Sequence, residues 1–259
     1  MKYELKAENP IGVIDSGVGG ISVLRELVKV LPCENFIFFG DSVHAPYGTK
    51  TVEEVRELTA RNATALFEEG CKGLVIACNT ATSAAARYLR EQYPEIPLVG
   101  IEPAIKPAAN YKEYPTILAM ATPMTIREEK FQKLMAGYKD KANIIPLPCP
   151  GLMDFVERGD LDGDDLRKYL VELFYAFKDI QIDAVVLGCT HYPFVADMIK
   201  QVLPGTVQLF DGGEGTAREM KRRLAEAGLL NPSKEVGKVV IRNSLDQKKI
   251  ELCKKLLEK

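Results

Sequence analysis

The sequence lacks the features that mark secreted, membrane-spanning or nucleic-acid-binding proteins. Residues 1–10 mix Lys and Glu without the apolar stretch of a signal peptide, and no apolar run reaches the roughly 18 residues that a membrane span needs. The formal net charge is only −2, with basic and acidic residues interspersed, so no basic patch indicates nucleic-acid binding. We therefore expect a cytoplasmic protein with no membrane or nucleic-acid partner.

Signs of a zinc-binding or nucleotide-binding module are also missing. The sequence has six cysteines but no CxxC pair of the kind found in zinc knuckles or thioredoxin-type sites. In a cytoplasmic protein of this size we expect the cysteines to remain thiols. Residues 15–20 (DSGVGG) fail as a dinucleotide fingerprint, because the sixth position of a G-x-G-x-x-G motif that starts at Gly17 is Ser22.

What the sequence contains is a regular alternation of short apolar runs and longer helical patterns. The chain has 259 residues, of which 46% are hydrophobic, and this is ample material for a core. Most of the short runs are continuous in Val, Ile and Leu, which is typical of parallel strands covered on both faces. The strands are predicted at 11–15, 36–40, 74–78, 98–101, 117–121, 144–147, 184–189, 207–211 and 239–242. Their alternation with helices predicts a doubly wound α/β fold.

Three helix ends can be predicted from capping patterns. Thr51 and Glu54 form a capping-box pattern at the start of one helix. Gly228 is expected to follow the helix at 218–227 as its C′ glycine. Ser244, with Gln247 three residues later, is predicted to cap the last helix.

A weak internal repeat predicts two related lobes. Residues 74–80 (LVIACNT) resemble residues 185–191 (VVLGCTH), which places the second cysteine 111 positions after the first (189 less 78). The strand that ends at Asp15 has a counterpart ending near Thr122, 107 positions later (122 less 15). Two such lobes, facing each other, would bring the two cysteine-bearing strand ends to opposite walls of one cleft.

The lobe boundaries are predicted from the same pattern. The chain is expected to leave the first lobe near 102–107 and to return to it near 211–215. We therefore assign residues 1–102 plus 212–259 to the N-terminal lobe, which carries Cys78. Residues 103–211 form the second lobe, which carries Cys189.

Polar or titratable side chains follow several of the predicted strands. In open parallel sheets, ligands bind outside the carboxyl ends of the strands, so these residues are the candidates for chemistry. They are Asp15, Ser16, Asp41, Ser42, Cys78, Asn79, Thr80, Thr122, Cys149, Cys189, Thr190 and His191. The two runs Cys-Asn-Thr and Cys-Thr-His at related positions suggest a paired role for the thiols.

His191 is the candidate partner of the second thiol. An imidazolium beside Cys189 would lower its pKa from about 8.5 towards neutrality. The alternative is a buried cysteine followed by a surface histidine. The only other histidine, His44, precedes a turn-like Pro46-Tyr47-Gly48 segment and is interpreted as a rim residue rather than a base.

The residues around the first thiol also allow two interpretations. Asn79 and Thr80 place Cys78 at a helix N-terminus, where backbone N–H groups would bind a carboxylate. The alternative is an ordinary strand-to-helix junction with an Asn or Thr cap. Asp15 would lie beside a thiol or an ammonium group, or would simply be a turn acid. By periodicity, Glu157 is an exposed acid at a helix end.

A pair of opposed thiols suits the inversion of an α-carbon. Inversion needs a base on one face and an acid on the other, and the two exchange roles with the direction of reaction. A thiol needs little tuning for its pKa to lie near the working pH, where general acid–base groups work best. Hydrogen-bond donors aimed at the α-carboxylate would stabilise the carbanion or enediolate.

The motifs together resemble those of the glutamate racemases, within the aspartate/glutamate racemase superfamily. The similarity runs from residue 11 to about residue 224, and the combination is far more specific than any one motif. The motifs are 15–20 (DSGVGG), 40–42 (GDS), 46–48 (PYG), 78–80 (CNT), 121–122 (AT) and 188–193 (GCTHYP).

The resemblance implies an isomerase that interconverts L- and D-glutamate. It implies two flavodoxin-like, doubly wound lobes with mainly parallel sheets, related by pseudo-twofold symmetry, with the active site in the cleft between them. It also implies that no cofactor and no metal are needed, that the protein forms a homodimer, and that it supplies D-glutamate for peptidoglycan synthesis, cell-wall biogenesis and cell shape.

The resemblance also gives roles to individual residues. The catalytic cysteines fall on Cys78, which would serve D-glutamate, and Cys189, which would deprotonate L-glutamate. Asp15 and His191 match auxiliary residues beside the thiols. Asp41 and Glu157 match acids near the site. The residues that match substrate contacts are Asp15, Ser16, Pro46, Tyr47, Gly48, Asn79, Thr80, Thr122, Thr190 and His191.

Other functions stay open at this point. An aspartate or broad-specificity amino-acid racemase would differ in pocket depth, which the sequence does not show. A cysteine hydrolase would use Cys189 with His191, but it leaves the Cys-Asn-Thr run around Cys78 unexplained. A non-catalytic binding protein would not need either thiol. A metal site of both cysteines and His191 would lack a fourth ligand and the usual spacing.

Overall fold

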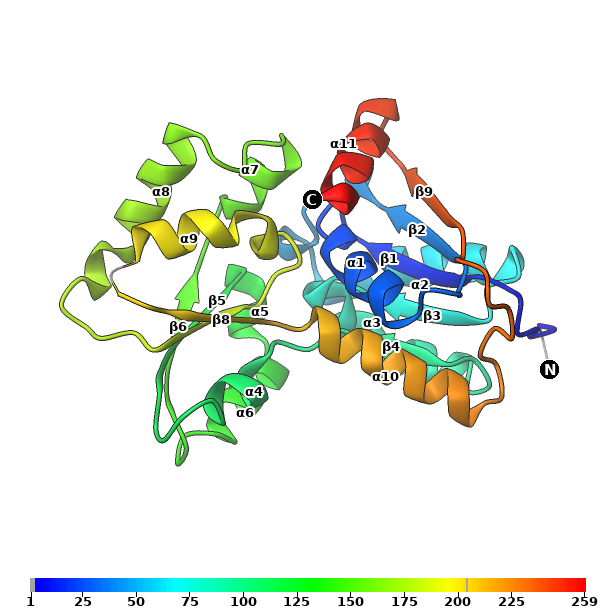
Figure 1. The fold of residues 1–259 in the computed structure, drawn as a ribbon, viewed down its shortest axis with the longest axis horizontal. Coiled ribbons are helices and arrows are strands. Elements are labelled where there is room, and N and C mark those ends of the chain that lie inside the picture. The colour runs from blue at the N-terminus through cyan, green and yellow to red at the C-terminus, as the bar shows by residue number, and fades with distance from the viewer. Residues whose placement is uncertain (1–2, 204) are drawn as a thin grey trace. The chain divides into compact units, whose positions relative to one another are not determined.

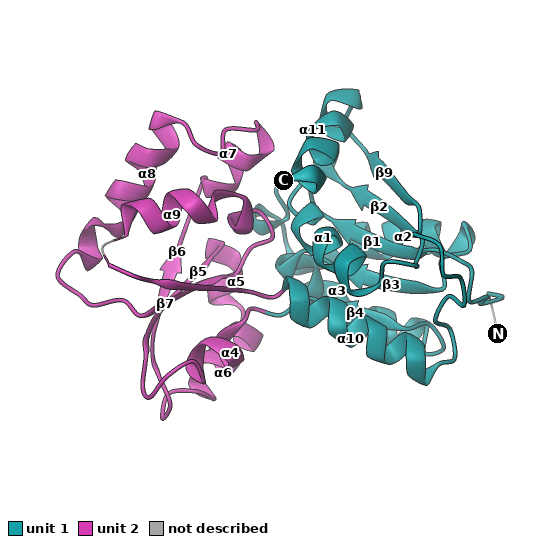
Figure 2. Cartoon of the chain, viewed as in Figure 1, with its two compact units in different colours: residues 1–102, 213–259 teal, residues 103–212 magenta. Residues whose placement is uncertain are grey.

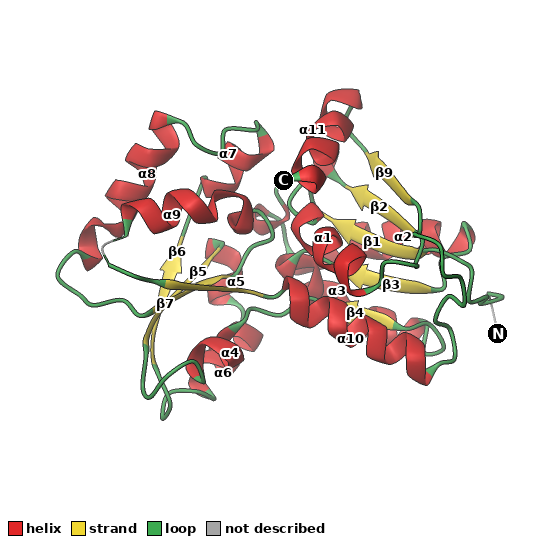
Figure 3. Ribbon diagram, in the orientation of Figure 1, coloured by secondary structure: helices red, strands yellow, loops and turns green. Residues whose placement is uncertain are grey.

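The computed structural model describes residues 3–203 and 205–259, so Met1, Lys2 and Pro204 lie outside the described residues. Strands and helices alternate along the chain, and every predicted strand is present (Figure 3). Three strands end earlier than predicted, at Ile76, Gly100 and Leu187. In the first and the last of these, the chain turns away from the sheet before the cysteine. The cysteines therefore lie just beyond the strands.

The chain divides into two compact units, each with its own sheet (Figure 2). Unit 1 comprises Met1–Glu102 and Gly213–Lys259, and unit 2 comprises Pro103–Gly212. No helix among the described residues is long and apolar enough to cross a membrane.

Unit 1 contains a five-stranded sheet in which all neighbouring strands are parallel. Its order is β4-β3-β1-β2-β9. The strands are β1 (Ile11–Asp15), β2 (Phe36–Gly40), β3 (Gly73–Ile76), β4 (Leu98–Gly100) and β9 (Val239–Asn243). β1 and β3 are buried along their whole length, as their continuous apolar sequences predicted.

Helices cover both faces of the unit 1 sheet (Figure 1). One face carries α1 (Ile21–Val30), α10 (Gly213–Glu226) and α11 (Gln247–Glu258). The other carries α2 (Val52–Glu68) and α3 (Asn79–Gln92), and two short 3₁₀ turns, η1 (Ser42–His44) and η2 (Tyr47–Thr49), follow β2. The helices α2 and α3 pack their apolar faces on the sheet in one buried cluster.

The predicted helix ends are confirmed in two cases and wrong in one. Thr51 and Glu54 form a complete capping box at the start of α2. Gly228 adopts a positive φ of 67° after α10, as a C′ glycine should. The last helix is capped by Asp246, whose side chain accepts from Lys249 N, and not by Ser244. Ser244 Oγ instead accepts a hydrogen bond from Val43 N.

Unit 2 contains a four-stranded parallel sheet in the order β6-β5-β7-β8. The strands are β5 (Thr116–Ala121), β6 (Asn143–Pro148), β7 (Ala184–Leu187) and β8 (Gln208–Asp211). One face carries α4 (Ile105–Ala109), α5 (Pro123–Arg127) and α6 (Glu129–Ala136), which share a buried cluster with β5 and β7. The other carries α7 (Leu152–Glu157), α8 (Asp164–Phe174) and α9 (Ala196–Val202), with 3₁₀ turns η3 (Tyr175–Phe177) and η4 (Tyr192–Val195) (Figure 1).

The two sheets share one topology. Four strands of unit 1 lie in the order β4-β3-β1-β2, and the strands of unit 2 repeat it as β8-β7-β5-β6. This is the flavodoxin-like order, whose switch point lies between the first and third strands of each unit. The doubly wound α/β fold predicted from the sequence is therefore confirmed. The segments that follow β1 and β3, and those that follow β5 and β7, lie where such sheets bind ligands.

Candidate active site

The first thiol lies at the switch point of the unit 1 sheet. Cys78 follows β3 and is the N-cap residue of α3, so it stands where the first backbone N–H groups of the helix have no intrahelical partner. The Cys78 thiol donates to Ser16 Oγ across 3.6 Å, and Ser16 directly follows β1. Both side chains are buried. A thiol, a hydroxyl and free N–H groups together suit the binding of a carboxylate.

Asp15 is held in place by the turn that it begins. Its Oδ1 accepts a hydrogen bond from Gly17 N at 2.9 Å, which closes a turn of the kind that aspartate favours. The turn needs glycine at position 20, because a Cβ there would lie 2.5 Å from Asp15 Cβ. Asp15 is thus a turn acid, and it also lies at the switch point. The two interpretations made from the sequence, a turn acid and an acid beside a thiol or an ammonium group, are therefore compatible.

Asn79 presents a buried acceptor beside Cys78. Its side chain is 8% exposed, and its Oδ1 has no hydrogen-bond partner among the described residues. Leaving such a group unpaired costs about 1–3 kcal/mol, which a ligand N–H donor would recover. Thr80, the next residue of α3, is also buried. The start of α3 therefore offers both donors and an acceptor.

Asp41 is the centre of a second polar cluster in unit 1. Its Oδ1 lies 2.8 Å from His44 Nδ1, and its Oδ2 accepts from Tyr47 Oη at 2.8 Å and Asn62 Nδ2 at 3.2 Å. Burial alone would raise the pKa of Asp41, but these hydrogen bonds outweigh it and hold the pKa below its ordinary value. Asp41 is therefore an anion at neutral pH although it is 1% exposed.

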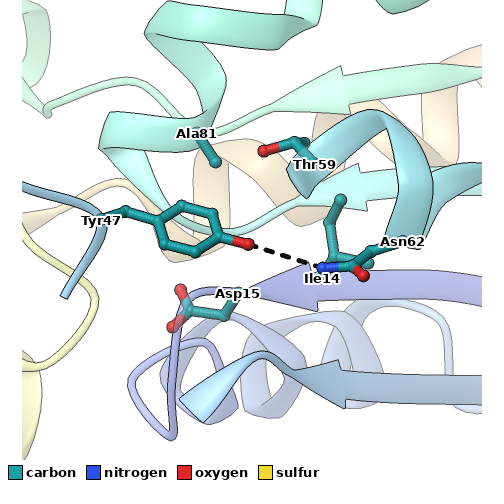
Figure 4. A pocket seen from close by; sticks show the side chains of 6 residues that line it. All are labelled: Ile14, Asp15, Tyr47, Thr59, Asn62 and Ala81. Atoms are coloured by element: carbon teal, nitrogen blue, oxygen red, sulfur yellow. Dashed lines mark hydrogen bonds between the residues drawn. The ribbon is translucent and has the colours of Figure 1, made fainter. Parts of the chain in front are cut away.

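A small pocket joins this cluster to Asp15 (Figure 4). Its lining residues are Ile14, Asp15, Tyr47, Thr59, Asn62 and Ala81. The Tyr47 hydroxyl points towards the Asn62 amide, with 3.5 Å between Oη and Nδ2. Tyr47 thus stands between the Asp41 cluster and the end of β1. Pro46 and Gly48 flank it as the N-cap and the second residue of η2.

The second thiol lies at the switch point of the unit 2 sheet. Cys189 follows β7, and its Sγ is 3.5 Å from His191 Nδ1. The other ring nitrogen, His191 Nε2, is 2.8 Å from Glu157 Oε1 at the end of α7. The histidine is 2% exposed and the cysteine 9%. The imidazole thus connects a buried thiol to a carboxylate.

The electrostatic setting of His191 favours its charged form. Burial alone would lower its pKa, but the contacts with Cys189 and Glu157 outweigh burial and raise the pKa well above the ordinary value. An imidazolium beside the thiol stabilises the thiolate, which is the form that abstracts a proton. The pair is therefore suited to general acid–base chemistry.

Two more candidate residues from the sequence analysis lie at the carboxyl ends of strands in the unit 2 sheet. Thr122 follows β5 and caps α5, accepting from Thr125 N at 3.2 Å. Thr190 lies between the thiol and His191 and is buried. A third thiol, Cys149, also lies at this edge, but burial raises its pKa to about 12, so it is neutral at physiological pH.

The structure corrects one interpretation made from periodicity. Glu157 does lie at a helix end, but it is not an exposed acid, because it is bonded to His191 in the fold. His44 is about a third exposed, in agreement with a rim position, although it is also bound to Asp41.

Sequence reasoning missed Asn62. The sequence does contain a signal for a buried polar role, because the Asn62 amide lies on the apolar face of α2, four residues after Leu58 and four before Leu66.

The comparison with models of protein families shows to which family the chain belongs. Residues 11–220 match the family model described as Asp/Glu/Hydantoin racemase. This covers most of the chain. The chain belongs to the Asp/Glu/hydantoin racemase family.

Glutamate racemases are among the relatives of this racemase. The glutamate racemase of Clostridium perfringens is 51% identical over 259 residues, which cover 100% of this chain and 99% of the relative. The crystal structure of glutamate racemase from Francisella tularensis in complex with D-glutamate has a TM-score of 0.83 at 28% identity, covering 98% of this chain and 95% of that one.

The Escherichia coli glutamate racemase is a further structural neighbour. It was solved in complex with L-glutamate and the activator UDP-MurNAc-ala, with a TM-score of 0.82 at 29% identity. The match covers 96% of this chain and 94% of that one. The matches to these two solved racemases therefore cover both units of this chain.

Proposed function

We propose that this protein racemises glutamate without a cofactor, using Cys78 and Cys189 as its acid/base pair. Its full-length relatives are glutamate racemases, and the two structural neighbours described above hold D-glutamate and L-glutamate. The observation that carries the mechanism is the matched placement of the thiols. Each follows the third strand of its own unit, beside a polar turn that follows the first strand.

The reaction requires the two thiols to reach opposite faces of one α-carbon. With L-glutamate, the Cys189 thiolate takes the α-proton while the Cys78 thiol donates its own proton to the other face. The products are D-glutamate, a Cys189 thiol and a Cys78 thiolate. With D-glutamate the roles are exchanged, so no atom or electron is gained or lost over the reaction.

The groups beside each thiol support these steps. His191, held by Glu157, stabilises the Cys189 thiolate as an ion pair. On the other side, Ser16 contacts the Cys78 thiol, and in this proposal Asp15 binds the substrate ammonium group. Substrate contacts come from Pro46, Tyr47, Gly48, Asn79, Thr80, Thr122 and Thr190, and their donors would stabilise negative charge on the α-carboxylate in the transition state.

A cysteine hydrolase is the alternative that one observation favours. Cys189, His191 and Glu157 form a thiol–imidazole–carboxylate array like that of a hydrolytic triad. A hydrolase, however, has no use for a second thiol at the matching position of the other unit. An acyl-enzyme burst with an ester or amide substrate would support the hydrolase, whereas solvent deuterium at Cα would support the racemase.

The experiment that tests the proposal follows optical rotation and deuterium incorporation in D₂O, with each enantiomer of glutamate and aspartate. We expect both glutamate enantiomers to reach the same end point, with deuterium at Cα, and aspartate to react far more slowly. Cys33→Ser serves as a control, because this thiol lies outside both switch points. Equal rates with aspartate would favour a broad-specificity racemase.

The cellular setting is part of the same proposal. From the resemblance to glutamate racemases, we propose that the protein supplies D-glutamate for peptidoglycan in the cytoplasm and acts as a homodimer. Light scattering on the purified protein measures the oligomeric state. Growth of a depleted strain with and without added D-glutamate tests the metabolic role.

A further inference from the structure

Two residues to which no role has been given contact the carboxylate that holds Tyr47. His44 Nδ1 lies 2.8 Å from Asp41 Oδ1, and Asn62 Nδ2 donates to Asp41 Oδ2 at 3.2 Å. Tyr47 Oη donates to the same Oδ2 at 2.8 Å. We refer to Asp41, His44, Tyr47 and Asn62 as the Asp41 clasp. Each of the other three members touches the carboxylate directly.

The clasp ties a short segment to two rigid elements. Asp41 follows β2, and its backbone N donates to Asp15 O at 2.9 Å, which fixes the carboxylate to the end of β1. Asn62 lies on the buried face of α2, a 17-residue helix with a complete capping box. Between them in the sequence, Pro46 is the N-cap of η2, a 3₁₀ turn of only three residues to which Tyr47 and Gly48 belong. The segment that carries Tyr47 therefore depends on side-chain contacts for its position.

The charge of Asp41 gives these contacts a direction. An ionised carboxylate only accepts hydrogen bonds, so the Tyr47 hydroxyl proton must point towards Asp41. Burial and the neighbouring Asp41 charge raise the pKa of Tyr47, which keeps this proton on the phenol. Arg61 adds a cation 4.0 Å from Oδ2. The hydroxyl is thereby fixed in one orientation and is not available as an acid in the reaction.

We propose that His44 and Asn62 are positioning residues that act through Asp41. By holding the carboxylate from two sides, they fix Tyr47 and the segment 46–48, and so maintain the surface to which glutamate binds. His44 acts from the solvent-facing side and Asn62 from the buried side. The inference rests on the proposed function, because it takes 46–48 as part of the glutamate site.

The first test needs no ligand. Hydrogen exchange of the backbone amides of Thr49 and Lys50 reports whether the turn is held, because these amides donate to Pro46 O and Tyr47 O. We expect faster exchange in Asn62→Leu and in His44→Ala than in the wild type. Thr64→Val is the matched control. Thr64 lies on the same helix α2 but outside the pocket, and its hydroxyl is bonded to Tyr93 Oη at 2.8 Å rather than to the clasp.

The second test measures KM and kcat for both enantiomers. A hydrogen bond to a charged group is worth enough to change KM by about tenfold, so we expect Asn62→Leu and His44→Ala to raise KM by about this factor with kcat little changed. His44→Asn should restore KM, because its amide nitrogen takes the place of Nδ1. Thr64→Val should match the wild type.

A double-mutant cycle separates positioning from general destabilisation. If Asn62 acts through the clasp, Asn62→Leu should add little to KM in a Tyr47→Phe background, where the hydroxyl is already gone. Additive effects on KM, or equal effects of Asn62→Leu and Thr64→Val, would overturn the proposal. If Asn62→Leu does not fold, the His44→Ala and His44→Asn pair decides it alone.

The two proposals fail in different ways. A wild type that does not turn over glutamate would refute the proposed function, while hydrogen exchange would still show whether the clasp holds the turn. A wild type that racemises glutamate but has unchanged exchange and KM in the clasp variants would refute only this inference.

Discussion

Glu157 Oε1 lies 2.8 Å from His191 Nε2, although 34 residues separate the two in the sequence. The histidine is buried and its other nitrogen faces the Cys189 thiol at 3.5 Å. The carboxylate thus acts on the thiol only through the imidazole. This arrangement fixes the orientation of the ring and favours its charged form.

Replacing Glu157 by Gln should narrow the pH range of activity on the alkaline side. The contacts with Cys189 and Glu157 raise the pKa of His191 against the effect of burial, so losing the carboxylate charge lets that pKa fall. The variant should then lose the imidazolium at a lower pH. We expect the alkaline limb of kcat/KM against pH to move to lower pH.

The control for this shift is Asp154→Asn, which removes an exposed carboxylate from the same helix. It should leave the alkaline limb in place. An unchanged limb in Glu157→Gln would mean that the carboxylate does not control the charge of His191.

Replacing either Cys78 or Cys189 by serine should abolish racemisation but leave proton exchange with the solvent at one face of the α-carbon. In Cys189→Ser the Cys78 thiolate can still remove the α-proton of D-glutamate and return a solvent proton to the same face. We therefore expect Cys189→Ser to exchange the α-proton of D-glutamate for deuterium without inversion. By the same reasoning, Cys78→Ser should exchange the α-proton of L-glutamate without inversion. Mass spectrometry with chiral separation measures both.

Racemisation itself should fall by orders of magnitude in both variants, with glutamate binding retained. Full racemase activity in either one, compared with Cys33→Ser, would contradict a two-thiol mechanism.

Asp41→Asn should alter how stability depends on pH. The pKa of Asp41 is lower in the fold than its ordinary value of 3.8, so ionised Asp41 contributes stability above pH 3.8 that is lost as pH falls through the folded pKa. The variant lacks this contribution. We expect its Tm to be below that of the wild type at pH 7, and the difference to shrink under acid conditions.

Thermal melts between pH 3 and pH 7 measure this difference. Glu251→Gln, which changes an exposed carboxylate on α11, should track the wild type throughout. A constant gap between Asp41→Asn and the wild type would show that the carboxylate charge is not what stabilises the clasp.

Lys72→Met should destabilise the protein strongly although it lies away from both switch points. Lys72 and Glu34 form a fully buried ion pair, 2.5 Å from Nζ to Oε2, and Lys72 also donates to Ala7 O. Removing one partner of such a pair costs about 3–5 kcal/mol, because the other charge stays buried. Urea denaturation measures the loss.

Adding Glu34→Gln to Lys72→Met should recover part of the loss, since it removes the unpaired charge while keeping an acceptor for Asn231 N. Lys248→Met, at an exposed position on α11, is the control for loss of a surface lysine. A double variant less stable than Lys72→Met would contradict the ion-pair explanation.

Gly188→Ala should damage the site through the backbone. A Cβ at this position would lie 2.6 Å from Met120 O, the atom that accepts the Gly188 N–H at 2.7 Å. The end of β7 must therefore shift, and Cys189 with it. Because misplacing a reacting group by about 1 Å can cost about 10²-fold, we expect kcat/KM to fall by up to that factor.

Gly215→Ala is the matched glycine control. No atom lies within 4 Å of a Cβ built at Gly215 in α10. This variant should keep full activity and gain up to about 1 kcal/mol of stability. Full activity in Gly188→Ala would show that the strand end tolerates the added methyl group.

The sequence predicted the sheets well because parallel strands buried on both faces have a direct sequence pattern. Runs such as 11–14 and 184–187 contain only apolar residues and glycine, and the strands that they form were predicted within about two residues of their observed bounds. The cap of the last helix was wrong because Ser and Asp are both favoured N-cap residues, and Gln247, three residues after Ser244, pointed to Ser244 instead of Asp246. Only the fold, in which Ser244 bonds to Val43, distinguishes them.

The candidate site was predictable where chemistry follows strands directly. Cys78 and Cys189 each come two residues after the last residue of a strand, so the rule for parallel sheets was enough to select them. Glu157 and Asn62 come from helices, and no local pattern shows which strand end a helical side chain will meet. Their contacts with His191 and Asp41 exist only once helix and sheet have packed.

The sequence by itself determined the alternation of strands and helices, the matched cysteine runs and the resemblance to racemases, because these depend on neighbours along the chain. Only the tertiary structure decided that His191 is bonded to a carboxylate, that Asp41 holds Tyr47, and that the strands of the two sheets lie in the same spatial order. The physical reason is that hydrogen bonds and charges act over a few ångströms in space, between groups that many residues can separate in sequence.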